Sequence, residues 1–285
     1  MTDLIIIGGG PAGASAALYA LRANLSVLLL ENGPGALGKA HRIENYYGIT
    51  AAGPNLYNAG LQQLRELGAQ IIHTEALSVD YTGNFAVQTD GALYEAPAVI
   101  LATGGKSATL RLDGLQQLEG HGVSYCAVCD GFFYRGKKVA VLGSGAYALH
   151  EADYLRHLAG SVIVLTNGQS GRAAVKGGFT VDERPLKAVT GTEKITGVTF
   201  ADGSSLSLDG LFVALGTAGS TDMARKMGAA VDGRYISVDD NCATNIPGLF
   251  AAGDCTGGML QVAKAVYQGA VAGNAAVSYV RSRTN

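Results

Sequence analysis

The sequence of 285 residues has no excess of basic residues, few cysteines and no long unbroken apolar run, and each absence excludes a class of protein. Its formal net charge of −2 leaves no basic footprint, so nucleic acid is not an expected partner. Four cysteines are too few for a small scaffold held together by disulfides. Only one Cys-x-x-Cys pair is present, with no second such pair and no His-x-x-x-His, so a zinc or other metal site is not expected.

The most apolar stretch, Leu4–Leu30, carries Arg22 as its one charged residue. The run Gly8-Gly9-Gly10-Pro11 interrupts it too early for a membrane-spanning helix of about 20 apolar residues. Asp3 lies where a secretory signal would carry positive charge. We therefore expect no membrane span, no targeting segment and a cytoplasmic location.

Glycine is abundant, with 41 residues, about twice its usual share of roughly 7%. An apolar, glycine-rich chain is typical of α/β proteins, whose strands run into helices through tight turns. The apolar pattern predicts a first βαβ unit with a strand over Leu4–Ile7, a helix over Ala12–Ala23 and a strand over Ser26–Leu30. After it we predict a helix over Leu61–Leu67 and strands over Ala69–His73, Ala76–Asp80, Phe85–Thr89 and Val99–Ala102.

The same strand–glycine–helix pattern occurs a second time. Lys138–Leu142 and Ser161–Leu165 are the predicted strands of this unit, and Tyr147–Leu158 is its predicted helix. Two such units indicate two α/β domains, arranged either in sequence or with the second inserted into the first. Toward the C-terminus we predict strands over Leu211–Leu215 and Leu249–Ala252 and a long helix over Leu260–Val280.

The first glycine turn, Gly8-Gly9-Gly10-Pro11-Ala12-Gly13, fits the dinucleotide-binding pattern G-x-G-x-x-G. Gly8 permits the tight turn, Gly10 lets a pyrophosphate approach the backbone, and Gly13 lets the helix meet the strand. The helix N-terminus then offers N–H groups to the phosphates. Glu31, at the end of the next strand, can accept the ribose hydroxyls. The alternative is a structural glycine turn, with Glu31 as a solvated strand end.

Near the C-terminus, Gly248–Asp254 runs from a strand through a turn to a carboxylate. Asp254 can bond a ribityl or pyrophosphate group, and Gln261 would start the helix behind it. The alternative is that Asp254 only caps a helix.

The pair Cys126-Ala127-Val128-Cys129 is followed directly by Asp130, just before the second βαβ unit. A zinc site lacks its other ligands, and two buried free thiols do not explain the acid. A redox-active disulfide explains all three residues, because a helix N-terminus lowers a thiol pKa and Asp130 is placed to carry the proton of thiolate exchange.

Several motifs together resemble the low-molecular-weight, bacterial type of thioredoxin reductase. The segment YCAVCDGFFY at Tyr125–Tyr134 is similar to the active-site signature of that family, and the resemblance covers nearly the whole chain. The other matching motifs are GGGPAG at Gly8–Gly13, ENYYG at Glu44–Gly48, ATGG at Ala102–Gly105 and GLFAAGDCTGG at Gly248–Gly258.

The resemblance implies an α/β fold of two Rossmann-like three-layer dinucleotide-binding domains, the second inserted into the first. The FAD-binding domain would comprise residues 1–114 and 241–285, and the redox domain residues 115–240. It further implies that FAD is held by residues from both chain ends, namely Gly8, Gly10, Pro11, Ala12, Gly13, Glu31, Asn45, Thr103, Gly104, Gly253, Asp254 and Gln261.

The resemblance also implies the roles of the redox residues. Cys129 faces the flavin and attacks its C4a position, Cys126 attacks the disulfide of a thioredoxin-like protein, and Asp130 is the acid–base group. Such enzymes are homodimers, and their domains rotate so that the pair can leave the flavin and meet its substrate.

The second glycine turn departs from the family pattern. Gly143, Gly145 and Ala146 belong to an acceptable G-x-G-x-x-A, followed by Glu151, but the strand after it should lead into H-R-R-x-x-x-R, which grips the NADPH 2′-phosphate. In Thr166–Arg172 only Arg172 remains, and no acid replaces the cluster. Moreover, the segment between Arg172 and Gly197 is too short for the helix and strand that NADPH-using relatives carry there.

These departures resemble the branches of the family that work without a pyridine nucleotide. One branch takes electrons from ferredoxin, and another holds a second flavin in place of NAD(P)H. We therefore expect a donor other than NADPH, with the ordinary NADPH-dependent thioredoxin reductase as the alternative. Arg135, Lys137 and Lys138 are either a dock for an acidic ferredoxin or a solvated turn. A flavin reductase of the ferredoxin–NADP type would lack the cysteine pair, and a redox sensor would not need Asp130.

Overall fold

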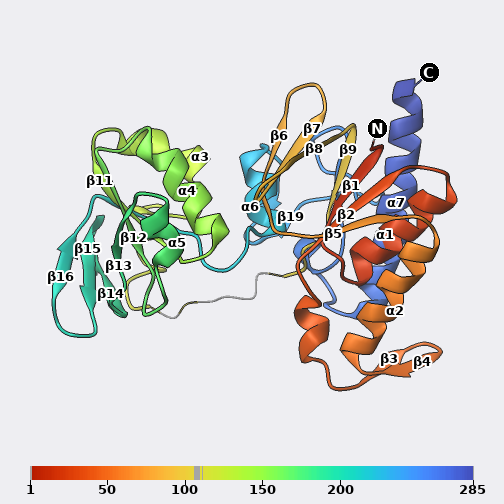
Figure 1. Cartoon of the computed structure of the whole chain (residues 1–285), viewed down its shortest axis with the longest axis horizontal. Coiled ribbons are helices and arrows are strands. Elements are labelled where there is room, and N and C mark those ends of the chain that lie inside the picture. Colours follow the sequence, from red (N-terminus) through yellow and green to blue (C-terminus); the bar gives the residue numbers. More distant parts are fainter. Residues whose placement is uncertain (1, 106–109, 111, 285) are drawn as a thin grey trace. The chain divides into compact units, whose positions relative to one another are not determined.

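The structure is a computed structural model that describes residues 2–105, 110 and 112–284. Its internal contacts divide the chain into two compact units (Figure 1). Unit 1 comprises Met1–Lys106 and Gly219–Asn285, and unit 2 comprises Ser107–Ala218. The second unit is therefore inserted, in chain order, within the first. The domain limits predicted from the sequence, residues 1–114 with 241–285 and residues 115–240, stay a prediction.

A five-stranded parallel sheet forms the centre of unit 1, and its inner strands are almost entirely apolar and buried. A strand that is buried on both faces consists of a nearly continuous run of Val, Ile and Leu, and such runs can be recognised in the sequence. The strand order is β20 (Leu249–Ala251), β9 (Ala98–Leu101), β1 (Leu4–Ile7), β2 (Val27–Glu31) and β5 (Gln70–His73).

Two helices from opposite chain ends, α1 (Pro11–Arg22) and α7 (Val262–Thr284), pack side by side in unit 1 (Figure 1). Their approach requires small residues, because a Cβ added at Gly269 would lie 2.1 Å from the Ala12 carbonyl oxygen. The Ser15 hydroxyl also donates to the Val266 carbonyl at 2.8 Å. This packing holds the start of α1, which follows the first glycine turn, against the C-terminal part of the chain.

The remaining elements of unit 1 are smaller. They are η1 (Gly35–Lys39), the hairpin of β3 (Ile43–Tyr46) and β4 (Ile49–Ala51), α2 (Gly53–Glu66), the antiparallel meander of β6 (Ala76–Tyr81), β7 (Phe85–Thr89) and β8 (Leu93–Ala96), α6 (Ser220–Lys226), the pair β18 (Val231–Asp232) and β19 (Tyr235–Ile236), and η3 (Asp254–Thr256).

Unit 2 also has a five-stranded parallel sheet, which carries the cysteine pair next to its first strand. The strand order is β10 (Val123–Ser124), β17 (Gly210–Val213), β11 (Lys138–Leu142), β12 (Ser161–Leu165) and β13 (Thr180–Asp182). The other elements are α3 (Ala127–Asp130), η2 (Gly131–Tyr134), α4 (Ala146–Arg156), α5 (Arg172–Lys176) and the antiparallel sheet of β14 (Leu186–Gly191), β15 (Ile195–Phe200) and β16 (Ser205–Ser207).

The predicted fold class of two Rossmann-like units, each with a parallel sheet, is confirmed. Two local predictions are wrong. The helix expected over Leu61–Leu67 begins at Gly53, because Pro54 suits a first helical turn. The segment that begins at Arg172 does hold a helix and a strand, because both are short: α5 has five residues and β13 has three. Among the described residues, no helix combines the length and apolar character needed to cross a membrane.

Candidate functional site

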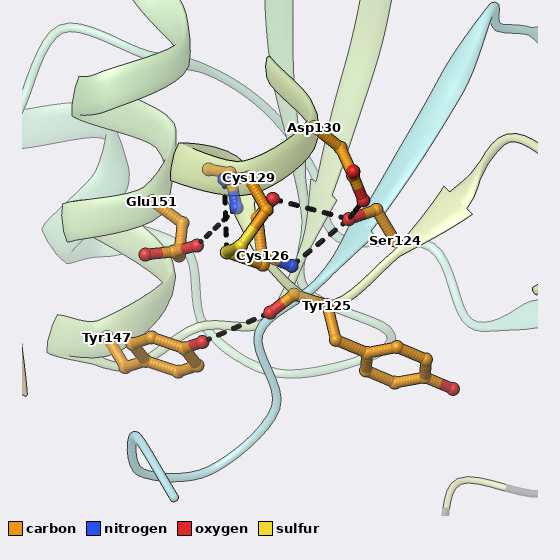
Figure 2. Close-up of a disulfide and its surroundings, with 8 residues drawn as sticks. Ser124, Tyr125, Cys126, Cys129, Asp130, Tyr147 and Glu151 are labelled. Carbon is orange, nitrogen blue, oxygen red and sulfur yellow. Dashed lines mark hydrogen bonds between the residues drawn. A yellow bond between two sulfur atoms is a disulfide. The ribbon is translucent and has the colours of Figure 1, made fainter. Parts of the chain in front are cut away.

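The structure joins Cys126 and Cys129 as a disulfide at the start of α3 in unit 2 (Figure 2). Their Cα atoms are 5.3 Å apart, inside the range that a disulfide spans. Cys126 is the N-cap of α3, and its Sγ accepts the Cys129 backbone N–H at 3.1 Å. The Cys-x-x-Cys spacing thus places both sulfurs on one helical turn.

Two carboxylates flank the disulfide (Figure 2). Asp130 accepts the Ser124 hydroxyl at 2.6 Å, and the same Ser124 oxygen accepts the Cys126 N–H at 3.0 Å. Glu151, which is buried on α4, accepts the Ala127 N–H at 2.9 Å. Ser124 therefore links the predicted acid–base residue to the backbone of the first cysteine, a contact that the sequence analysis missed.

The two cysteines differ in accessibility. Cys126 is buried, with 6% of its surface exposed, whereas Cys129 is exposed. Around them, Val128, Phe132 and Phe133 expose 43%, 64% and 68% of their surfaces. Exposed large apolar side chains gathered within a few residues of a reactive group are typical of an interaction surface.

The first glycine turn of unit 1 has the geometry that a dinucleotide needs. A Cβ at Gly13 would lie 1.9 Å from the Gly8 carbonyl oxygen, so Gly13 permits helix and strand to meet. In contrast, a Cβ at Gly10 or Gly104 would meet no atom within 4 Å. These two glycines leave open space at the carboxyl ends of β1 and β9, and a pyrophosphate fits such a cradle at a helix N-terminus.

Glu31, at the end of β2, lies against this turn, since a Cβ at Gly9 would be 2.8 Å from the Glu31 Cβ. Its carboxylate accepts the Gly33 N–H at 2.8 Å and the Tyr57 hydroxyl, and it lies 2.8 Å from His73 Nδ1. Burial alone would raise the pKa of Glu31, but these partners outweigh it and hold the pKa below its usual value. The carboxylate has about four acceptor positions, which leaves one for a ribose hydroxyl.

The C-terminal turn meets the start of α1, as expected for a site built from both chain ends. A Cβ at Gly253 would lie 2.9 Å from the Ala12 Cβ, and one at Gly105 would lie 3.7 Å from the Asp254 Cβ. The Thr103 hydroxyl lies 2.8 Å from that of Ser220. The structure thus gathers Gly8, Gly10, Pro11, Ala12, Gly13, Glu31, Thr103, Gly104, Gly253 and Asp254 along the carboxyl edge of one sheet.

Asn45 and Gln261 are joined to each other. The Asn45 side-chain amide donates to Gln261 Oε1 at 2.8 Å. Gln261 precedes the first residue of α7, and its carbonyl accepts the Ala265 N–H at 3.0 Å. This contact links the β3–β4 hairpin to the start of α7.

Lys264 is a residue of unit 1 that the sequence analysis missed. Its half-buried ammonium donates to the carbonyls of Gly253 and Gly257 at 2.7 and 2.6 Å and to the Thr256 hydroxyl at 3.0 Å. All three of its N–H donors are therefore used on the turn that carries Asp254. A single charge in the apolar first turns of α7 is the signal that could have identified it.

Replacing Lys264 with Met is expected to lower the free energy of unfolding by about 2 kcal/mol, because three acceptors lose a charged donor. Denaturant unfolding monitored by circular dichroism measures this change. Lys39→Met is the control, because Lys39 is an exposed lysine of the same unit. Equal unfolding midpoints for the two variants would contradict the prediction.

The second glycine turn, in unit 2, packs against the end of β17 and contacts the loop that follows β12. A Cβ at Gly143 would lie 2.2 Å from the Ala214 carbonyl oxygen, and Gly145 is the N-cap of α4, which begins at Ala146. The Ser144 hydroxyl donates to Gln169 Oε1, in the loop where the basic cluster was expected.

An acid from outside Thr166–Arg172 does reach that loop, and the sequence analysis missed it. The Glu183 carboxylate accepts the Gly171 N–H at 2.6 Å, although Glu183 follows β13 rather than β12. Arg172, the remaining basic residue of the expected cluster, is the exposed first residue of α5.

Two further cysteines, Cys242 and Cys255, are free and buried. Burial raises their pKa values, to about 11 for Cys242 and about 12 for Cys255, so neither thiol forms a thiolate readily. Within the described part of the chain, no group of three or more His, Cys, Asp or Glu side chains has the arrangement to hold a metal ion.

Comparisons with known proteins agree with this geometry. The family of pyridine nucleotide-disulphide oxidoreductases matches residues 2–269. The thioredoxin reductase of Listeria monocytogenes is 35% identical, over 98% of this chain and 93% of that protein. The solved structure of an atypical thioredoxin reductase from Desulfovibrio vulgaris Hildenborough is 38% identical, with a TM-score of 0.93 over 99% of both chains. A ferredoxin-flavin thioredoxin reductase from Clostridium acetobutylicum is 31% identical, with a TM-score of 0.74 over 99% of this chain and 98% of that one.

Proposed function

The chain belongs to the pyridine nucleotide-disulphide oxidoreductases and, among them, to the low-molecular-weight thioredoxin reductases, and from this premise we propose how it works as a flavoprotein oxidoreductase. Electrons pass through FAD to the Cys126–Cys129 disulfide and then to a thioredoxin-type protein. The observation that carries the proposal is the disulfide on α3, with a carboxylate bonded beside it and exposed apolar side chains around it.

The cradle of unit 1 is the proposed FAD site. Gly10 and Gly104 leave room for the pyrophosphate, and Glu31 would accept a ribose hydroxyl. Asp254 and the linked Asn45–Gln261 pair are proposed to hold the rest of the cofactor. When bound, FAD supplies the two electrons that open the disulfide.

Thiol–disulfide exchange then delivers these electrons to the substrate. The Cys126 thiolate attacks one sulfur of the substrate disulfide, which forms a mixed disulfide and releases one substrate thiolate. The Cys129 thiolate next attacks the Cys126 sulfur, which restores the Cys126–Cys129 bond and releases the second substrate thiolate. The substrate gains two electrons, and its two thiolates take up two protons.

Asp130 is the proposed acid–base residue for these proton transfers. It is adjacent to Cys129 in the chain, and its bond to Ser124 connects it to the Cys126 backbone. A carboxylate fixed in this way can take a proton from the attacking thiol and return it to a leaving thiolate.

The surface formed by Val128, Phe132 and Phe133 is proposed to dock the protein substrate. These side chains lie within four residues of Cys129 and are among the most exposed apolar groups of unit 2. Burial of aromatic side chains against a partner supplies much of the affinity in protein interfaces.

The proposed electron donor is not NADPH. The expected basic cluster is missing from the loop after β12; Gln169 lies in that loop instead, and the Glu183 carboxylate contacts it. The contraction of the domain no longer supports this proposal, because α5 and β13 are present. The similarity to a ferredoxin-flavin thioredoxin reductase supports ferredoxin as the donor, and two one-electron ferredoxins would open one disulfide.

The exposed Arg135 and Lys137 are the proposed contacts for this acidic partner. A homodimer and a cytoplasmic location stay predictions.

An anaerobic reduction experiment tests both the redox pair and the donor. Reduced ferredoxin or dithionite is expected to bleach the flavin promptly and to raise the thiol count of the denatured chain from two to four, because Cys242 and Cys255 are already free. NADPH is expected to leave the flavin coloured and the count at two. A colourless protein that does not take up FAD would refute the proposed function, and rapid stoichiometric bleaching by NADPH would refute only the proposed donor.

A further inference from the structure

The loop of residues 166–171 in unit 2 lies where a Rossmann-type unit recognises the adenosine ribose. In that fold, the group at the end of the second strand distinguishes a free 2′-hydroxyl from a 2′-phosphate. The second strand is β12, and its neighbour β13 runs parallel to it, with Leu165 opposite Asp182. Residues that follow β13 therefore emerge at the same edge as the loop.

Glu183 is the residue that β13 brings to this loop. Its backbone carbonyl accepts the Gly168 N–H at 2.8 Å, and its carboxylate accepts the Gly171 N–H at 2.6 Å. A Cβ at Gly171 would lie 2.3 Å from the Val181 side chain and 3.2 Å from Glu183 Oε1, so the loop lies directly against this carboxylate. Two hydrogen bonds therefore fix Glu183 against the loop.

The other end of the same loop contacts the glycine turn. Ser144 of the turn donates to Gln169 of the loop. Gln169 is held in turn by the Thr166 hydroxyl, which donates to its carbonyl at 2.5 Å. The glycine turn and the loop that carries Glu183 therefore form one connected edge of unit 2.

The one cation next to Glu183 along the chain, Arg184, is already paired with other carboxylates and so is not available to bind a phosphate. Arg184 is engaged by Asp182, at 2.9 Å from its Nε and 2.5 Å from its Nη2, and by Asp202 at 3.7 Å. Only Arg172, next to Gly171, offers a positive charge within residues 166–172. Glu183 thus places a carboxylate at the loop that holds arginines in an NADPH site.

We propose that Glu183 determines the nucleotide specificity of this second turn: it rejects a 2′-phosphate and admits an adenosine whose 2′-hydroxyl is free. The inference deepens the proposed function, on which it rests, because it assigns the exclusion of NADPH to one carboxylate. Two dinucleotides carry the accepted adenosine, NADH and a second FAD.

The test compares Glu183→Gln with the wild type in the FAD-loaded protein. Glutamine keeps an oxygen for the Gly171 N–H and removes the charge, so the loop retains its bond. Equilibrium dialysis with NADPH, NADH and added FAD gives the three dissociation constants. In the wild type, NADH or added FAD is expected to bind at least about tenfold more tightly than NADPH, and Glu183→Gln is expected to reduce that ratio to near one. Glu193→Gln, which removes an exposed charge from the β14–β15 turn, is expected to keep the wild-type ratio.

The outcomes separate this inference from the proposed function. Wild-type binding of NADPH as tight as that of NADH and FAD would overturn it, as would an unchanged ratio in Glu183→Gln. Absence of binding of all three dinucleotides to both proteins at millimolar concentration would also overturn it. None of these results depends on the cysteine pair, whereas failure to reduce thioredoxin with a normal dialysis result would refute only the proposed function.

Discussion

Serine at Cys126 or at Cys129 is expected to lower the rate of thioredoxin-disulfide reduction by about three orders of magnitude or more. A hydroxyl cannot form the disulfide that stores two electrons, so the path from the flavin to the substrate is interrupted. The measurement is the appearance of thioredoxin thiols under anaerobic conditions, with the flavin kept reduced by dithionite. Cys242→Ala is the control, because Cys242 is a free, buried thiol of unit 1 that is expected to leave the rate unchanged.

The two serine variants are expected to differ in what they trap. If Cys126 attacks the substrate, Cys129→Ser holds a mixed disulfide with thioredoxin, because the resolving thiol is missing, whereas Cys126→Ser holds none. Exposure alone suggests the reverse order, since Cys126 is buried and Cys129 is exposed. Non-reducing electrophoresis distinguishes the two orders. A mixed disulfide formed only by Cys126→Ser would reverse the proposed roles, and full turnover by either variant would exclude the pair as the electron carrier.

The parallel sheets and glycine turns were predictable because their signals are local in the sequence. A buried parallel strand is a short apolar run, and the turn after it needs glycine at fixed spacing. Leu4–Ile7 with Gly8–Gly13, and Lys138–Leu142 with Gly143–Ala146, both follow this rule. The helix over Leu61–Leu67 was placed too late, because residues 53–60 include two glycines, a proline and two asparagines, which are poor helix formers.

The supporting contacts of the site were not predictable, because strands and helices distant in the sequence create them. Tyr57 and His73 reach Glu31 from α2 and β5, and Glu183 reaches its loop only because β13 pairs with β12. Lys264, in the first turn of α7, donates hydrogen bonds to the turn that follows β20. A sequence pattern gives the residue at each strand end, whereas register and packing decide which neighbouring side chains meet it.

Alanine at Gly13 is expected to lower stability, whereas alanine at Gly10 is expected to lower FAD affinity, although both change the same glycine turn. A methyl group at Gly13 would overlap the Gly8 carbonyl oxygen at 1.9 Å, and this neighbour is backbone, which cannot turn aside as a flexible side chain can. We expect Gly13→Ala to lower the free energy of unfolding by about 3 kcal/mol. Denaturant unfolding of the FAD-free protein measures this loss directly.

Gly10→Ala serves as the matched variant, because its methyl group would meet no atom within 4 Å and its extended backbone suits any residue. The free energy of unfolding of the FAD-free protein should change by less than about 1 kcal/mol. FAD affinity should nevertheless fall by about tenfold or more, because the added methyl group occupies the space proposed for the pyrophosphate. Normal FAD affinity in Gly10→Ala would mean that this open space is not where the phosphates lie. The two variants together thus separate the glycine that the fold requires from the glycine that the cofactor requires.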